Sequence, residues 1–337
     1  MKPTINFFIF LLILGFTGTG CSKEGGPKPI VEPLNDQSLP SAAILNVEVL
    51  DKSSDQLRLR LNLAVFRDSK NLEDNLDADA FKINPIDLWG NDFPIQNTLT
   101  RFVNGASGAN YSALMLMDQS GSISGTDPED FRLDAAKYFC LNLGSGNNTA
   151  LWKFSGSTYT NMIDFTADTS KVIQEIESLR GKESGGTPLY ASQYEAITYT
   201  KAQSNKNRKA VLSFTDGQSS SGGKTSEEVV QHALTEGVIL YNIGLGDVNT
   251  EQLQDQAIKS KGAFMYAKDA RQLISIFGNL GKLLDNTAAY YQTEWVISSP
   301  DSDVSIPAYD EVEHELQITF PFGGQITVPF RFSYTLE

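Results

Sequence analysis

Five oxygen-bearing side chains, spread over three separate parts of the chain, have the types and spacing to bind a hard cation. Three of them stand at alternating positions of one short loop, where they can converge on a single ion while the glycine between them lets the backbone turn closely. Oxygen donors without His or Cys favour Mg²⁺, with Mn²⁺ or Ca²⁺ as alternatives, over softer metals. The five residues are Asp118, Ser120, Ser122, Thr187 and Asp216.

The charge of this donor set indicates what the ion could do. Two carboxylates and three hydroxyls do not saturate a divalent cation, so an exchangeable position remains on it. An Asp or Glu side chain of a partner protein can fill that position. The residues therefore predict non-covalent protein binding through a metal. The alternative is that Asp118 and Ser122 only cap the helix that starts near Pro128, and that Asp216 only starts a turn.

These side chains need a scaffold that brings distant segments to one edge. Between residues 112 and 285, apolar strand-like runs alternate with helical patterns, which predicts a doubly wound, mostly parallel, Rossmann-like α/β sheet. Ligands bind such sheets beyond the carboxyl ends of the strands, where Asp118 and Asp216 stand. The expected strands are 113–117, 151–154, 210–214, 238–243 and 263–266, and the expected helices are 128–143, 169–179, 189–203, 226–236 and 271–284.

The whole set resembles the metal-ion-dependent adhesion site of von Willebrand factor type A domains, which occur in integrins and many bacterial surface proteins. Every position of the D-x-S-x-S…T…D pattern is matched, and the resemblance covers about half of the chain. It implies that the strands before Asp118 and Asp216 are neighbours, with an antiparallel edge strand at 159–165. It also implies that Ser120, Ser122 and sometimes Thr187 contact the metal directly, while the two aspartates act largely through water.

The segments that flank this region alternate between apolar and polar residues, as half-buried strands of antiparallel sheets do. Neither flank is large enough to form a sandwich alone, so we expect the two to pair into one β-sandwich in which the α/β region is inserted. The expected divisions are a signal peptide at 1–20, a tether at 21–42, sandwich strands at 43–111 and 287–337, and the α/β domain at 112–286.

The N-terminus has the features of an export signal followed by a lipid anchor. Lys2 precedes a short apolar run that is too short to span a bilayer, and small residues then lead to Cys21. This resembles the lipobox of bacterial lipoproteins, with Gly18 where the family usually has Leu. The resemblance implies lipidation of Cys21 and a place in the bacterial cell envelope as an outer-membrane lipoprotein, facing either the periplasm or the exterior. The alternative is an ordinary cleaved signal with a free thiol.

Composition excludes several classes of function. The 41 acidic residues outnumber the 27 basic ones, for a net charge of −14, which excludes duplex nucleic acid as the main partner. It also argues against electrostatic binding to anionic lipid, so any membrane contact is expected only through the anchor. Two His and two Cys leave little for a zinc site or a disulfide framework. No credible acid/base pair accompanies the metal pattern, so we expect no enzyme.

Two glycines interrupt the apolar face of the last expected helix, and they allow two interpretations. Gly278 and Gly281 either permit close packing or let the helix slide when the metal loop rearranges.

The function expected is metal-dependent adhesion or another protein–protein interaction. The alternative function is that of a periplasm-facing scaffold or assembly subunit of an envelope complex.

Overall fold

Asp118 ends a strand in the interior of a ten-stranded sheet. The computed structural model describes residues 36–219 and 223–336, and the sheet has the order β6-β13-β2-β1-β12-β11-β10-β7-β8-β9. Its α/β half consists of β7 (Tyr111–Asp118), β8 (Asn148–Ser155), β9 (Thr158–Thr166), β10 (Arg208–Thr215), β11 (Ile239–Leu245) and β12 (Ala263–Ala267).

The two strands that lead to the aspartates are direct neighbours. β7 and β10 pair in parallel, with Met117 opposite Phe214, so Asp118 and Asp216 leave the sheet at the same edge. β8, β11 and β12 continue the parallel arrangement. β9 is antiparallel to β8 and forms the edge, as the resemblance implied.

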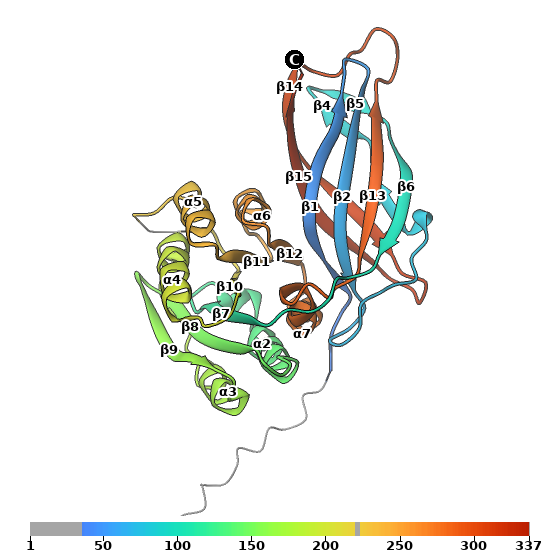
Figure 1. The fold of residues 1–337 in the computed structure, drawn as a ribbon. Helices are drawn as coiled ribbons and strands as arrows, with labels where there is room; N and C mark the ends of the chain where they lie inside the picture. Colours follow the sequence, from blue (N-terminus) through green and yellow to red (C-terminus); the bar gives the residue numbers. More distant parts are fainter. Residues whose placement is uncertain (1–35, 220–222, 337) are drawn as a thin grey trace, which may run out of the picture. The chain divides into compact units, whose positions relative to one another are not determined.

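Helices cover both faces of this half of the sheet. β7 shows why, since its alternating side chains are buried on both sides: Met115 and Met117 face one cluster and Leu114 and Leu116 the other. Figure 1 shows α2, α3 and α7 on one face and α4, α5 and α6 on the opposite face. Their bounds are α2 (Phe131–Leu141), α3 (Thr169–Glu177), α4 (Leu189–Gln203), α5 (Ser226–Glu236), α6 (Thr250–Lys259) and α7 (Gln272–Leu284).

The flanking segments form antiparallel sheets, as expected from their alternation. β1 (Ser41–Lys52), β2 (Gln56–Phe66), β6 (Ile95–Val103) and β13 (Tyr290–Ser298) make up the rest of the large sheet. A second sheet contains β3 (Phe81–Ile83), β14 (Tyr309–Thr319) and β15 (Gln325–Thr335), and a short hairpin contains β4 (Ile86–Leu88) and β5 (Asn91–Phe93). A short 3-10 helix spans Ala78–Ala80. Apolar side chains of the first group and of the second sheet share one core.

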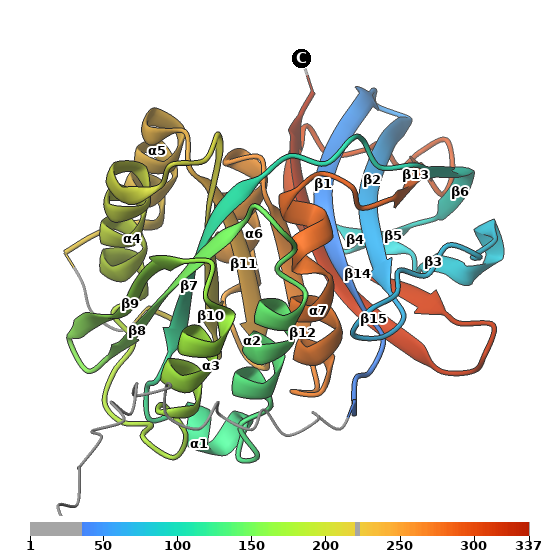
Figure 2. The ribbon, with the colours of Figure 1, turned by 60° about the horizontal axis from the view of Figure 1, so that its bottom comes forward.

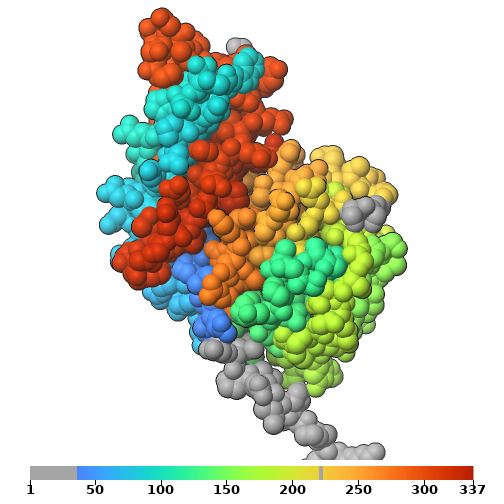
Figure 3. Space-filling model, turned by 180° about the vertical axis from the view of Figure 1, so that it is seen from behind, coloured from blue at the N-terminus to red at the C-terminus, as the bar shows by residue number. Residues whose placement is uncertain are grey.

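The sandwich and the α/β region are not separate bodies, which the sequence patterns did not indicate. β1 pairs antiparallel with β12, Ala43 opposite Met265 and Ile44 opposite Phe264, so one hydrogen-bonded sheet runs through both. Sheet β15-β14-β3 also meets the α/β half, because the Gln254 carboxamide of α6 bonds the backbone of Arg331 in β15 (Oε1 to N 3.2 Å, Nε2 to O 3.0 Å). Figure 3 shows the C-terminal strands, in red, directly against this orange part of the chain.

The N-terminal arm, residues 36–40, enters the fold at the same edge of the sheet as the aspartates, because β1 is antiparallel to β12. The arm is held on the start of α7. Gln272 Nε2 donates to Pro40 O at 2.9 Å, and Ser275 Oγ donates to Leu39 O at 2.7 Å. Ser275 Oγ also lies 2.8 Å from Ser41 Oγ. The chain therefore passes from this arm into β1 close to the carboxyl end of β12.

Candidate functional site

Asp118 is the best-buried member of the expected set, with none of its surface exposed. Its Oδ1 accepts a bond from the backbone N–H of Ser120 at 2.8 Å, and its Oδ2 accepts one from Thr215 Oγ1 at 2.7 Å. Burial raises the pKa of Asp118 to about 6, although the bonds from Ser120 and Thr215 act in the opposite direction. Both carboxylate oxygens are thus engaged by the protein, and they fix the loop that follows β7.

A chain of three oxygens crosses from this loop to the end of β10. Ser120 Oγ lies 3.0 Å from Ser122 Oγ, and Ser122 Oγ donates to Asp216 Oδ1 at 2.8 Å. Thr126, at the end of the short helix α1 (Ile123–Thr126), bonds the second oxygen of Asp216. Figure 2 shows α1 at the end of β7 and β10. The two strands therefore deliver hydroxyl and carboxylate oxygens to one place.

Thr187 lies beside this chain of oxygens. Gly217 follows Asp216, and a Cβ built on it would lie 3.8 Å from Ser122 Oγ and 3.8 Å from Thr187 Oγ1. Both hydroxyls thus lie near Gly217, and Thr187 is only 6% exposed. The structure brings all five sequence-derived residues to one edge of the sheet.

Two backbone hydrogen bonds join the loop of Ser120 to the loop of Thr187. Gly121 N donates to Gly185 O, and Ser184 N donates to Gln119 O, both at 2.9 Å. Gly185 has φ +76°, and a Cβ there would lie 2.7 Å from the Cα of Gly156. Glycine is therefore required at position 185 for the Thr187 loop to lie against the turn between β8 and β9.

The donor set fits a hard divalent cation. Ser120, Ser122 and Asp216 present oxygens within about hydrogen-bonding distance of one another, and Mg²⁺, Mn²⁺ and Ca²⁺ prefer such ligands. Over residues 36–219 and 223–336 no group of three or more His, Cys, Asp or Glu side chains could hold a metal.

Sequence reasoning missed several residues that shape the site. Thr215 and Thr126 bond the two aspartates, and Arg132 contacts Gln119 and Glu183. Thr215 could have been suspected because it directly precedes Asp216. Nothing in the sequence marks Arg132, since its contacts depend on how α2 packs.

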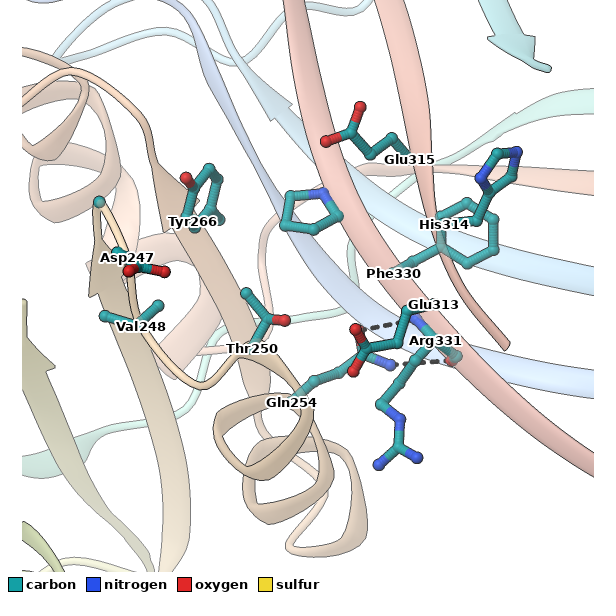
Figure 4. A pocket seen from close by; sticks show the side chains of 12 residues that line it. Asp247, Val248, Thr250, Gln254, Tyr266, Glu313, His314, Glu315, Phe330 and Arg331 are labelled. Carbon is teal, nitrogen blue, oxygen red and sulfur yellow. Dashed lines mark hydrogen bonds between the residues drawn. The ribbon is translucent and has the colours of Figure 1, made fainter. Parts of the chain in front are cut away.

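A cavity of about 510 Å³ lies next to the site, between the β11–α6 loop and the strands β14 and β15. A Cβ on Gly246, which lines it, would lie 3.9 Å from Thr126 Cγ2. In Figure 4, Asp247, Tyr266 and Glu315 border this space, and the guanidinium of Arg331 points away from Glu315. Burial raises the pKa of Tyr266, and the Glu315 and Asp247 carboxylates add to the effect. Three carboxylates line the cavity, those of Asp247, Glu313 and Glu315, together with Arg331 and His314.

The two cysteines differ in what the structure says of them. Cys21 and the expected signal peptide at 1–20 lie outside the described residues, as does most of the expected tether at 21–42. Cys140 in α2 is 1% exposed and unpaired. None of the helices in the described part of the chain is long and apolar enough to cross a membrane.

Comparison with known proteins agrees with this architecture. Residues 114–279 match the family model of the von Willebrand factor type A domain. Similar solved structures include proximal thread matrix protein 1 from the mussel byssus (20% identity, TM-score 0.46, covering 56% of this chain and 50% of that chain). Another is the vWF domain of the type V pili tip protein Mfa5 from Porphyromonas gingivalis (14% identity, TM-score 0.44, covering 52% of this chain and 95% of that chain). A third is a von Willebrand factor type A protein from Catenulispora acidiphila (12% identity, TM-score 0.44, covering 90% of this chain and 75% of that chain). No curated protein matches the chain in sequence.

Proposed function

We propose that the α/β region, of which residues 114–279 match the von Willebrand factor type A domain, binds a protein partner through a divalent cation. The observation that carries the proposal is the continuous row of oxygens from Ser120 through Ser122 to Asp216, at spacings of 3.0 and 2.8 Å. The proposed ion is Mg²⁺, with Mn²⁺ or Ca²⁺ as alternatives. The function is one of adhesion or protein–protein interaction, without a chemical reaction.

The five residues have different proposed roles. The hydroxyls of Ser120, Ser122 and Thr187 would ligate the cation directly. Asp118 would act indirectly, by fixing the loop that carries Ser120 and Ser122, because both of its oxygens already accept bonds from the protein. Asp216 would act largely through water and hold Ser122 in place. When bound, the cation supplies a Lewis-acid position that an Asp or Glu of the partner completes.

The test of the metal site compares wild type with Asp118→Ala and Asp216→Ala in Mn²⁺ or Mg²⁺ titration calorimetry. The control is Asp247→Ala, which removes an exposed carboxylate of the β11–α6 loop that is not one of the five residues. We expect the first two variants to fold but bind no ion, and the control to bind as wild type does. At an ion concentration of 100 times Kd, wild type should gain about 2.7 kcal/mol of unfolding free energy.

Two results would contradict the proposal. One is a wild-type protein that takes up no Mg²⁺, Mn²⁺ or Ca²⁺. The other is unchanged binding in Asp216→Ala. A protein that unfolds in EDTA would show instead that the ion is structural. A pull-down with Mg²⁺ or with EDTA then identifies the partner, which should be captured only with the ion.

We further propose that the protein acts in the bacterial cell envelope, anchored by a lipid on Cys21. The folded part would then bind its partner close to the outer membrane. The alternative is a scaffold subunit that faces the periplasm and organises an envelope complex. Protease treatment of intact cells separates the two, because only a surface-exposed protein is cleaved, and mass spectrometry of the N-terminal peptide tests acylation.

A further inference from the structure

Arg132 in α2 has a fully buried side chain surrounded by acidic groups. Its Nη1 bonds Asp127 Oδ2 at 3.1 Å and Asp130 Oδ1 at 2.5 Å. Its Nη2 bonds Gln119 Oε1 at 2.6 Å and also the carboxylate of Glu183. The side chains of Arg132 and Asp127 have no exposed surface. One guanidinium thus connects three carboxylates and one carboxamide in the interior.

Two of these partners belong to the loops that carry the proposed metal ligands. Gln119 lies between Asp118 and Ser120, and Glu183 directly precedes the loop that leads to Thr187. Arg132 Nη2 therefore contacts both loops with one nitrogen. The same loops are joined by the backbone bonds of Gly121 to Gly185 and of Ser184 to Gln119.

Stability alone does not account for such a network. Desolvation of a buried ion pair often cancels its attraction, and well-packed apolar residues of similar volume are often as stable. What a planar guanidinium adds is direction, since its fixed donors hold several acceptors at set angles. Here those acceptors lie in the two loops and in the turn of Asp127 and Asp130 that leads into α2.

We infer that Arg132 is a positioning residue, which holds the Ser120 loop against the Thr187 loop in their ion-binding arrangement before any ion is bound. The inference rests on the proposed function for its consequence, which is ion affinity. Outer partners that orient metal ligands typically contribute about 10- to 100-fold to affinity. In the ion-free protein the consequence is separate: the backbone bonds of Gly121 and Ser184 between the two loops should open more often once Arg132 no longer bridges them.

The chain offers a matched control in Arg180. Its guanidinium approaches the same Asp130 at 3.4 Å and also pairs with Asp134 and Glu177. Its ion pairs involve neither Gln119 nor Glu183. Arg180→Met thus removes a positive charge from the same network without removing the bridge.

The experiment measures Mn²⁺ affinity by calorimetry and amide hydrogen exchange in EDTA for Arg132→Lys, Gln119→Ala and Arg180→Met. We expect the first two to bind Mn²⁺ about 10- to 100-fold more weakly, and Arg180→Met to match wild type. In EDTA, the amides of Gly121 and Ser184 should exchange faster in the first two variants, while the amides of β10 keep their protection. A merely structural role would lower protection everywhere.

The inference is overturned if Arg132→Lys binds Mn²⁺ within about threefold of wild type, or if all amides lose protection together. Should Arg132→Lys fail to fold, Gln119→Ala decides when it is compared with Gln119→Glu. Both variants lose the bond from Gln119 Nε2 to Leu179 O, but only the alanine also loses the acceptor of Arg132 Nη2. A wild-type protein that binds none of Mn²⁺, Mg²⁺ and Ca²⁺ ends the proposed function. In that case the exchange of the Gly121 and Ser184 amides alone supports or overturns the inference.

Discussion

Replacing Gly278 by alanine should destabilise the protein, even though alanine favours helices. Gly278 lies in α7 against the turn that follows β2, and a Cβ there would lie 2.1 Å from Ser69 O. The contact is with backbone, so no side chain can rotate away. Helix and turn must therefore separate by more than about 1 Å to restore ordinary carbon–oxygen contact.

The separation would break hydrogen bonds that join the same two segments. Asn279 Nδ2 donates to Asp68 O at 2.7 Å, and Asn142 Nδ2 donates to Ser69 O at 3.4 Å. Each lost bond costs about 1 kcal/mol, and overpacking costs about 1–3 kcal/mol. The higher helix propensity of alanine offsets about 1 kcal/mol of this loss. The expected loss in unfolding free energy is about 2–4 kcal/mol.

Urea denaturation followed by circular dichroism measures this loss. Gly281→Ala is the control, because its Cβ would meet the hydroxyl of Tyr111 at 3.2 Å and Asn142 O at 3.4 Å, contacts that small shifts relieve. We expect Gly281→Ala to stay within about 1 kcal/mol of wild type. A Gly278→Ala protein as stable as wild type would refute the close-packing interpretation. It would favour the alternative in which the glycines let α7 slide, and ion affinity should then change in the double variant.

Three further predictions concern the rest of the chain. When residues 112–286 are expressed alone, the edge of β12 lacks its partner β1. An unpaired strand edge can pair with another chain, so this fragment should self-associate. Analytical ultracentrifugation that finds a monomer at all concentrations would contradict this. Burial raises the pKa of the Cys140 thiol to about 12. In a chain that starts at Ser22, and therefore lacks Cys21, a thiol reagent should react with Cys140 only in denaturant. Rapid reaction of the folded protein would be inconsistent with the burial. Gln254→Ala leaves the backbone N–H and C=O of Arg331 without their partner and should cost about 1–3 kcal/mol in urea unfolding, and no loss would show that water replaces the carboxamide.

The sequence predicted the α/β strands well because they are buried on both faces and bounded by turn residues. The helix α6 escaped notice, because its inner face carries Gln254 and Gln256 together with Leu253 and Ala257, which gives a weak apolar period. The Gln256 carboxamide is satisfied inside the protein by Asn242. A polar residue with a buried partner cannot be distinguished from a surface residue in the sequence alone.

Long-range pairing was beyond the reach of local patterns. The union of β1 with β12 joins segments more than two hundred residues apart, and nothing in either strand specifies the other. The five candidate ligands could be found because short loops at strand ends bring them together. Arg132 could not, since its acceptors Gln119 and Glu183 lie 13 and 51 residues away in the sequence.

The N-terminal arm and the proposed ligand position lie at the same edge of the large sheet, separated by β12, β11 and β10. If the arm were held on one side and the partner pulled on the other, the molecule would turn until the line between the two points followed the tension. That line runs across the strands, so the load would act along the inter-strand hydrogen bonds, among which the pairing of β1 with β12 is short. The bonds from Gln272 and Ser275 to the arm would be the first to resist.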